Sequence, residues 1–406
     1  MALVGAAVEH GAGGRHAGLN GLRGVLCIQI MIVHFIMAYV PDALTPFSPA
    51  MFPPTVDPHW LASWLTVPGV SLLTGGNFAV MTFFALSGYV FTLNYYAGKP
   101  DRLRVTLWGR YIRLTVAMAP IVLLSWLLSR GGFYATQDVA AATGSIAFGA
   151  QMPAAEMTLA NALRDMAWHV LMTGESHFNT ALWTVRYEFL GALMILLLFL
   201  AMPHGVRVVP VLCFAVLAAL VFGPFAIFVL VMLGGALVNA VRIPARAVPF
   251  LAFFGLFMGS YLPGHAPYSW MPAPFTAPDQ VFFNVPLYNM VGAVCLVAAV
   301  ARGFGGRFLS ARPLQWLGDL SYSAYLLHLL VLCSLSAGLF LALPRGDLTL
   351  LLNLVVYIAV VLALAAPYSA IVDAAGIRWA RRFGTWVTRA PGEVPRRRAG
   401  VVHPAE

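Results

Sequence analysis

The most informative shortage in this sequence is of charge. Asp, Glu, Lys and Arg make up only 10% of its 406 residues, and hydrophobic residues make up 60%. A soluble protein typically has about 25% charged residues. So few charged groups cannot cover a water-exposed surface, because charged and polar side chains dominate such surfaces. The composition therefore excludes an ordinary soluble protein and indicates that most of the surface faces lipid.

Cysteine is also scarce. The four cysteines lie in separate apolar segments and form neither a metal-binding spacing nor a disulfide framework. We interpret them as small residues of the core or of the lipid-facing surface, and we expect no metal ion. They are Cys27, Cys213, Cys295 and Cys333.

Long apolar runs are what the chain has in abundance. A hydrocarbon core of about 30 Å needs roughly 20 apolar residues per spanning helix, and such runs recur along nearly the whole sequence. We predict an all-α fold, a polytopic membrane helix bundle with about ten transmembrane helices. The predicted spans are residues 22–40, 76–97, 111–130, 181–202, 206–222, 224–240, 247–262, 286–302, 315–343 and 349–373.

Basic residues test these spans independently, since they gather in cytoplasmic loops. With the N-terminus inside, all but four of the 24 basic residues fall in segments that are predicted to be cytoplasmic. The exceptions are Arg130, Arg164, Arg186 and Arg345. We therefore predict that both termini are cytoplasmic. The net charge of +9 is then a topology signal and not a nucleic-acid-binding surface.

Three segments lie outside the predicted spans. Residues 41–75 and 131–180 are longer than a connection requires, so they either pack onto the bundle or form a lid over an outward-facing site. Within the second, residues 158–174 have apolar side chains at helical spacing, which suits a helix at the membrane interface. The membrane domain is predicted to cover residues 1–376. Residues 377–406 are predicted to be a basic, disordered cytoplasmic tail near anionic lipid.

Ionisable groups inside a membrane are costly unless they are paired or hydrated, so each is a candidate functional residue. In the first span, Arg23 lies at the predicted cytoplasmic entrance and His34 follows eleven residues later. Eleven residues make about three helical turns, with an excess of about 20°, so both side chains share one face, about 16 Å apart. A lone buried histidine is more often structural than catalytic, and the pair alone leaves both interpretations open.

The third predicted span begins with two arginines, Arg110 and Arg113, three residues apart on one helix face. They could simply anchor the helix at the cytoplasmic boundary, or they could form a fork for phosphate, which guanidinium groups bind well. Ser87 and Gly88, in the second span, permit close helix approach and are interpreted as structural.

Two further spans carry polar groups. Glu188 lies near the predicted outer end of the fourth span, and Arg186, two positions away, is on a different side of the helix. In the ninth span, polar side chains recur at i, i+4 and i+7 and form one stripe. They are Ser321, Tyr325 and His328. Because His328 and His34 are expected at similar depth, a shared polar site is more credible than either histidine alone.

These positions fall in five motifs that, in this order, resemble the acyltransferase-3 family of membrane acyltransferases, which includes O-antigen, exopolysaccharide and macrolide acyltransferases. The opening Leu19 to His34 resembles LDGLRG…H, with Asn20 where Asp is usual. The others are FFALSG at 83–88, the pair Arg110 and Arg113 of RxxR, LWTVRYE at 182–188, and LGDLSYSAYLLH at 317–328. The family's Glu-x-Pro after the last span is replaced by Asp373-Ala374-Ala375, which weakens the case for a role of Asp373.

The resemblance implies an acyl-coenzyme A donor on the cytoplasmic side and the hydroxyl of a carbohydrate or related acceptor. Arg110 and Arg113 would bind the nucleotide phosphates. Arg23 and Glu188 would complete a catalytic set around His34, which would act as general base or as a transient acyl carrier. Ser321, Tyr325 and His328 would form a further polar site. Acetyl is the simplest acyl group that fits.

A secondary transporter or flippase is the alternative, since ten helices with buried polar residues suit it too. We see no inverted repeat and no paired broken helices, which favours the enzyme. The expected partners are acyl-coenzyme A, a glycan or lipid-linked saccharide and membrane lipids, with no nucleic acid. The expected location is a cell membrane, crossed many times, and the inner membrane if the source is bacterial.

Overall fold

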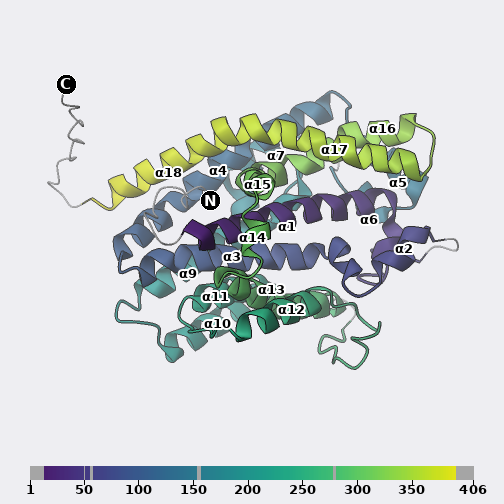
Figure 1. Cartoon of the computed structure of the whole chain (residues 1–406). Helices are drawn as coiled ribbons and strands as arrows, with labels where there is room; N and C mark the ends of the chain where they lie inside the picture. The colour runs from purple at the N-terminus through teal and green to yellow at the C-terminus, as the bar shows by residue number, and fades with distance from the viewer. Residues whose placement is uncertain (1–12, 50, 55–57, 153–156, 278–279, 390–406) are drawn as a thin grey trace, which may run out of the picture.

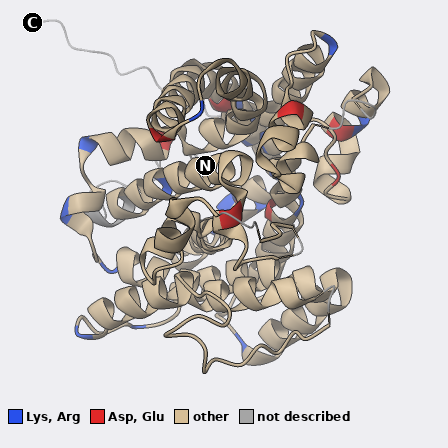
Figure 2. Cartoon of the chain, turned by 90° about the vertical axis from the view of Figure 1, so that its right-hand side faces the viewer, with Lys and Arg blue, Asp and Glu red and all other residues tan. Residues whose placement is uncertain are grey.

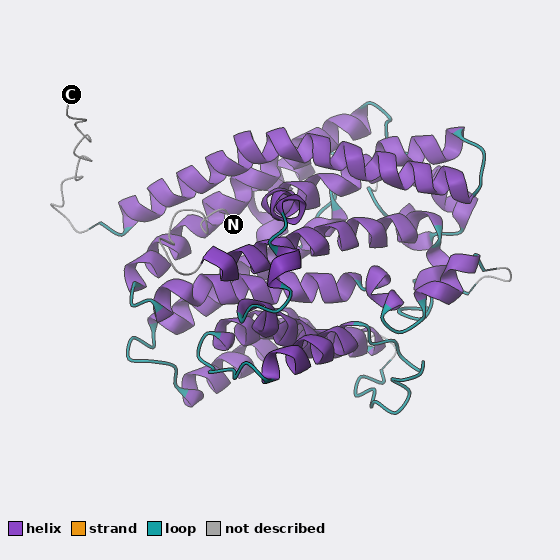
Figure 3. Ribbon diagram, in the orientation of Figure 1, coloured by secondary structure: helices purple, strands orange, loops and turns teal. Residues whose placement is uncertain are grey.

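The computed structural model describes residues 13–49, 51–54, 58–152, 157–277 and 280–389. These residues form helices and loops, and no strand occurs among them (Figure 3). The charged residues are few and scattered over a largely uncharged bundle (Figure 2). The predicted all-α helix bundle is confirmed.

The long helices form the body of the bundle. They are α1 (Gly13–Tyr39), α3 (Gly76–Tyr96), α4 (Pro100–Arg130), α9 (Trp183–Leu200), α10 (Val208–Phe222), α11 (Ala226–Val238), α12 (Ala247–Gly259), α13 (Asn284–Ala301), α15 (Arg312–Val331), α17 (Asp347–Tyr368) and α18 (Ala374–Val387). Short helices and turns connect them: η2 (Pro41–Leu44), α2 (Trp60–Leu65), η3 (Val70–Thr74), α5 (Thr136–Thr143), α6 (Ile146–Gly149), α7 (Leu159–Arg164), η5 (Asp165–His169), α8 (Val170–Met172), η6 (Thr180–Leu182), η7 (Gly223–Phe225), η8 (Val281–Phe283), α14 (Gly306–Leu309), η9 (Leu332–Ser336), α16 (Ala337–Ala342) and η10 (Ser369–Asp373).

The helices lie roughly side by side, with α1 and α3 through the middle of the bundle (Figure 1). Helices α17 and α18 run along one edge as one long rod joined by the π-helical turn η10, and α10 and α12 lie along the opposite edge. Among the described residues, eight helical segments are long and apolar enough to cross a membrane. One of them, Val208–Val238, is interrupted at η7, and α12 is a shorter apolar helix. The predicted count of ten therefore needs both halves of Val208–Val238 and α12 to cross, and it stays a prediction.

The two ends of the bundle differ. We call one the Arg-rich end: it contains the starts of α1, α4 and α15 together with α18, and the sequence predicts that it faces the cytoplasm. We call the other the loop end: it contains η2, α2, α5, α6 and the start of α17.

Small residues let α1 and α15 approach very closely. A Cβ atom at Gly24 would lie 2.7 Å from the carbonyl oxygen of Leu314 and 3.0 Å from the amide nitrogen of Gly318, so no larger residue fits without a shift. The two helices run in the same direction, and this contact fixes which of their residues face each other. It brings the polar residues of α1 next to the polar stripe of α15.

The tail departs from the prediction. Residues 377–387, predicted to be disordered, form most of α18, whose apolar face packs along α4. Ala380 lies against Gly109, and Gly384 lies against the backbone of Val105. The arginines of this stretch favour disorder, but its small and aromatic residues give one helix face that packs on α4. Residues 390–406 lie outside the described residues.

The second long outer segment packs onto the bundle in its described central part, which is one of the two arrangements predicted for it. Its central part, α7–η5–α8, packs along α4 and α9. The Tyr111 hydroxyl of α4 donates to the Ala167 carbonyl at 2.8 Å, and Tyr111 lies about 28 Å along the helix from its end at Arg130. The segment therefore runs along the outer side of α4 toward the Arg-rich end, beyond the interfacial position that its apolar spacing suggested.

Candidate active site

Two histidines meet at the centre of the candidate site. The rings of His34 on α1 and His328 on α15 lie edge to face, with their centroids 4.8 Å apart. Each Nδ1 lies near a carbonyl oxygen of its own helix, Ile30 at 2.9 Å and Tyr325 at 2.6 Å. Since a carbonyl only accepts hydrogen bonds, Nδ1 carries the proton in both rings, and Nε2 keeps a basic lone pair. His328 is fully buried, whereas His34 reaches a cavity.

The polar stripe on α15, formed by Ser321, Tyr325 and His328, makes further contacts with α1 and α9. Ser321 accepts a hydrogen bond from Arg23 Nη2 at 2.8 Å. The Tyr325 hydroxyl lies 2.6 Å from the Thr184 hydroxyl of α9, and it also donates to the Ala181 carbonyl. The predicted stripe therefore does face one site, with Ser321 nearer the Arg-rich end and His328 nearer the loop end.

Glu188, for which the sequence suggested no partner, forms an ion pair with Arg110. The Arg110 Nη2 lies 2.5 Å from Glu188 Oε1, and Ser87 donates to the same oxygen at 3.3 Å. Arg186 points elsewhere and donates to the Thr173 carbonyl at 3.1 Å. Arg110 is 5% exposed and stacks on the Phe91 ring at 4.6 Å, so it is not an open surface fork.

Arg113 is likewise buried and paired. Its Nη2 lies 2.5 Å from Asp373 Oδ1 in η10, and its guanidinium stacks on the ring of Tyr322 at 4.9 Å. The departure from the family motif at Asp373 had weakened the case for this residue, yet it is the carboxylate that neutralises Arg113.

Several donors at this end of the site lack a partner. Among the described residues, no hydrogen-bond partner is found for the Nε atoms of Arg23, Arg110 and Arg113, for Arg113 Nη1 or for the Tyr322 hydroxyl. Buried donors are normally satisfied, and leaving one unpaired costs about 1–3 kcal/mol. Five such donors in one place suit an acceptor-rich ligand that enters from the Arg-rich end.

Two cavities adjoin one another near His34. The small cavity, about 80 Å³, is lined by Ser87, Glu188 and Ser321 among others, on the side of the Arg-rich end. The large cavity, about 350 Å³, is lined by His34, by Trp183 and by segment 41–52 of the loop end, among others. Four lining residues belong to both: Ile30, Val80, Thr184 and Tyr325. The first long outer segment therefore supplies part of the wall of the large cavity.

The lining of the large cavity is mostly uncharged, and about a third of it is aromatic. Apart from His34 it contains no ionisable side chain other than the phenol of Tyr325, within the part of the chain that the structure describes. Its polar groups include the amides of Asn77 and Asn289. Its large aromatic residues are Phe47, Phe52, Trp183, Phe225, Phe228, Phe282 and Tyr325.

Comparison with known proteins decides the family. A family model described as an acyltransferase domain matches residues 16–370 of the 406. The chain belongs to the acyltransferase-3 family. No curated protein and no solved structure matches the chain. The resemblance carried by the five motifs is thus confirmed, and this acyltransferase-3 protein is an integral-membrane acyltransferase.

The acyltransferase-3 match covers the predicted site residues, and the structure brings them into one continuous region. His34, Arg23 and His328 are neighbours through α1 and α15, and Arg110 joins them through Glu188. Asp373 lies outside the matched residues, and the motifs did not indicate that it belongs to the site as the partner of Arg113. The signal for it was present, since a carboxylate at the end of a long apolar run needs a partner.

Proposed function

We propose that the protein transfers an acyl group, most simply acetyl, from acyl-coenzyme A to a hydroxyl of a carbohydrate or related acceptor. The observation that carries the proposal is the position of His34. It lines the large cavity next to the four residues shared with the small one, and its Nδ1 is held by Ile30, which leaves Nε2 as a base. Donor and acceptor, entering from opposite ends, would meet there.

In the proposed reaction His34 acts as general base. Nε2 takes the proton of the acceptor hydroxyl while its oxygen attacks the thioester carbonyl carbon. The carbon–sulfur bond breaks, the electron pair leaves on the coenzyme A sulfur, and a proton returns to that thiolate. A new ester forms on the acceptor. An imidazole suits this task because its unperturbed pKa lies near neutrality.

The donor is proposed to enter from the Arg-rich end. Three guanidinium groups lie there, those of Arg23, Arg110 and Arg113. Four of their buried nitrogens have no partner among the described residues, so they could donate to a ligand. Phosphates are well matched to guanidinium donors. The small cavity has room for only a few atoms, which suits the thioester end of the donor and not its nucleotide.

The acceptor is proposed to occupy the large cavity. Its volume of about 350 Å³ is within the usual range for small-molecule sites, about 300–1,000 Å³. Aromatic rings with a few neutral amides and hydroxyls suit an uncharged molecule that has both apolar faces and hydroxyls, such as a glycan or lipid-linked saccharide.

A reconstituted assay tests the proposal. The purified protein, in vesicles, is given radiolabelled acetyl-coenzyme A on one side and a panel of saccharide and lipid-linked saccharide acceptors on the other. We expect label in an acceptor ester, released by mild base. Movement of unmodified acceptor across the membrane without any donor would instead support the transporter. Label retained on the protein when no acceptor is present would indicate an acyl-histidine step.

A further inference from the structure

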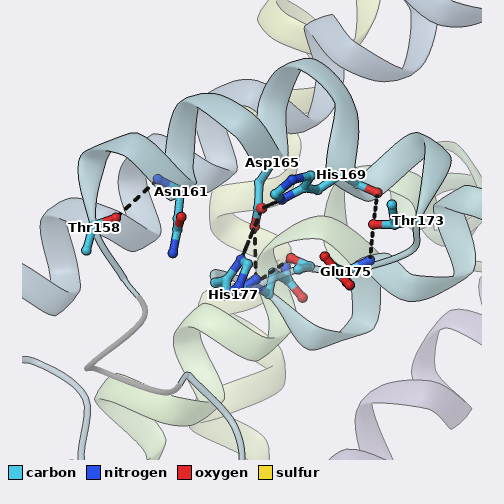
Figure 4. A network of polar contacts seen from close by, with 9 residues as sticks. Thr158, Asn161, Asp165, His169, Thr173, Glu175 and His177 are labelled. Carbon is cyan, nitrogen blue, oxygen red and sulfur yellow. Dashed lines mark hydrogen bonds and ion pairs between the residues drawn. The ribbon is translucent and has the colours of Figure 1, made fainter.

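A second group of polar side chains lies apart from the two cavities, in and after the segment α7–η5–α8 that packs on α4. Asp165 is fully buried and lies between the imidazoles of His169 and His177 (Figure 4). Its Oδ1 lies 3.3 Å from His169 Nδ1 and 3.1 Å from His177 Nδ1. Asp165 and His169 are the ends of the π-helical turn η5, a type of turn that is frequent at functional sites.

We propose that Asp165, His169 and His177 bind a divalent transition-metal ion of the zinc type. Two imidazoles and one carboxylate are a ligand set that zinc uses, with a fourth position left for water. In a tetrahedral zinc site, bonds of about 2.0–2.2 Å place neighbouring ligand atoms about 3.3 Å apart. The two distances around Asp165 Oδ1, 3.3 Å and 3.1 Å, are close to that separation.

The side chains can complete such a site with little movement. The ligand atoms of all three residues lie within 4.8 Å of one another. The histidine side chains are 25% and 20% exposed, so both rings can rotate by the small amount that would draw their nitrogens together. Asp165 is fixed, because its Oδ2 accepts the backbone N–H of His177 at 2.9 Å. That hydrogen bond leaves Oδ1 directed at the two rings.

Charge favours an ion here as well. A buried carboxylate is expensive unless a positive charge neutralises it. A divalent cation would supply that charge. The neighbouring surface is accessible, since His169 and His177 are both half-buried.

The ion would stabilise one connection of the fold. It would join the end of η5 to the loop at His177, two residues before Asn179. Asn179 is fully buried, donates to the Leu326 carbonyl of α15 and accepts the backbone N–H of Ala181. That loop leads directly into α9, which carries Trp183 and Thr184 of the large cavity. None of the three proposed ligands lines either cavity, so the role is structural and independent of the proposed reaction.

Metal binding can be measured without any activity assay. The full chain, purified in detergent and stripped with a chelator, is titrated with Zn²⁺ by calorimetry and with Co²⁺ by its visible absorption. We expect one ion per chain and a higher unfolding temperature with Zn²⁺. Loss of a mere outer-sphere partner costs about 10–100-fold in metal affinity, so His177→Gln or His169→Gln should cost at least as much.

The control is His265→Gln, because His265 is an exposed histidine outside this group. It should leave the stoichiometry, the affinity and the thermal shift unchanged. If the doubly substituted H169Q/H177Q protein binds Zn²⁺ as tightly as the wild type, or if the wild type binds none, the proposal is wrong. Should the double variant not fold, the Co²⁺ spectrum of the wild type decides: bands of four-coordinate cobalt with nitrogen and oxygen ligands support the site, and their absence overturns it.

Discussion

On the two sides of His34 the site is built from different chemistry. Toward the Arg-rich end, guanidinium groups are held by Glu188, Asp373 and Ser321 from three other helical segments. Toward the loop end, the large cavity has an uncharged lining with several aromatic rings and, among the described residues, almost no ionisable groups. Charged groups inside a membrane have to be paired, so the first side has little freedom to change. The second side can vary with the acceptor. This difference would follow if family members shared one charged donor but each used a different, neutral acceptor.

The largest effect on the transfer rate is expected at His34, where the two sides meet. His34→Gln keeps most of the size and polarity of the side chain but removes the basic nitrogen. If His34 is the general base, the rate of acyl transfer should fall by about 10²–10⁴. Coenzyme A affinity should be kept, because the buried arginines that are proposed to hold the phosphates remain. Transfer rates with labelled donor and equilibrium binding of coenzyme A measure the two quantities.

His328→Gln is the matched control for that experiment. His328 lies 4.8 Å from His34 but lines neither cavity, so we expect a smaller loss of rate through misplacement of the His34 ring. A folded His34→Gln protein with near-normal transfer would rule out the proposed base. A greater loss in His328→Gln would move that role to His328.

The next largest effect concerns the buried ion pair between Arg113 and Asp373. Asp373→Asn removes the carboxylate and leaves the guanidinium buried without its counter-charge. Breaking such a pair costs about 3–5 kcal/mol, so the unfolding temperature in detergent should drop clearly. The double variant Arg113→Met with Asp373→Asn should recover part of that stability, because no unpaired charge remains. A double variant that is less stable than Asp373→Asn would contradict this account.

Donor binding should show a more moderate effect. Losing one charge-assisted phosphate contact costs about 1.5–3 kcal/mol, or about ten- to a hundredfold in affinity. We expect Arg110→Ala and Arg113→Ala each to weaken coenzyme A binding by that factor. Arg102→Ala removes the same charge from an exposed position near the start of α4 and should change little. Equal losses in all three variants would mean that only the overall positive charge matters.

Sequence patterns predicted the helices and most of the polar residues because both depend on local information. Apolar runs give the spans, and helical periodicity places Arg23 and His34 on one face. The family motifs added the chemistry. The predicted start of the disordered tail at residue 377 was wrong, because residues 377–387 form part of α18. Arginines and aromatic residues at helical spacing can form an amphipathic helix as readily as a disordered tail.

The pairings could not be predicted in the same way. Arg110 and Glu188 lie on α4 and α9, and which faces meet depends on how each helix rotates in the bundle. Such rotations depend on tertiary contacts, of the kind that Gly24 makes between α1 and α15. The Asp165 group was missed for a related reason. Asp165 and His169 are four residues apart, but His177 joins them only because the chain turns back after α8.

The smallest predicted effect lies at the loop end, where Asp347 at the start of α17 holds α2. One carboxylate oxygen lies 3.1 Å from His59 Nε2, and the other accepts from Trp60 Nε1 at 2.9 Å. His59 in turn donates its backbone N–H to Asp42, close to the segment that lines the large cavity. Exposed pairs are worth about 0.2–1 kcal/mol. Asp347→Asn should therefore raise the KM for acceptor by at most about fivefold, with the affinity for coenzyme A unchanged. Asp101→Asn breaks a comparably exposed pair with Arg104 at the Arg-rich end and should alter neither quantity. If Asp347→Asn weakened coenzyme A binding as much as acceptor binding, the two sides of His34 would not be separate sites.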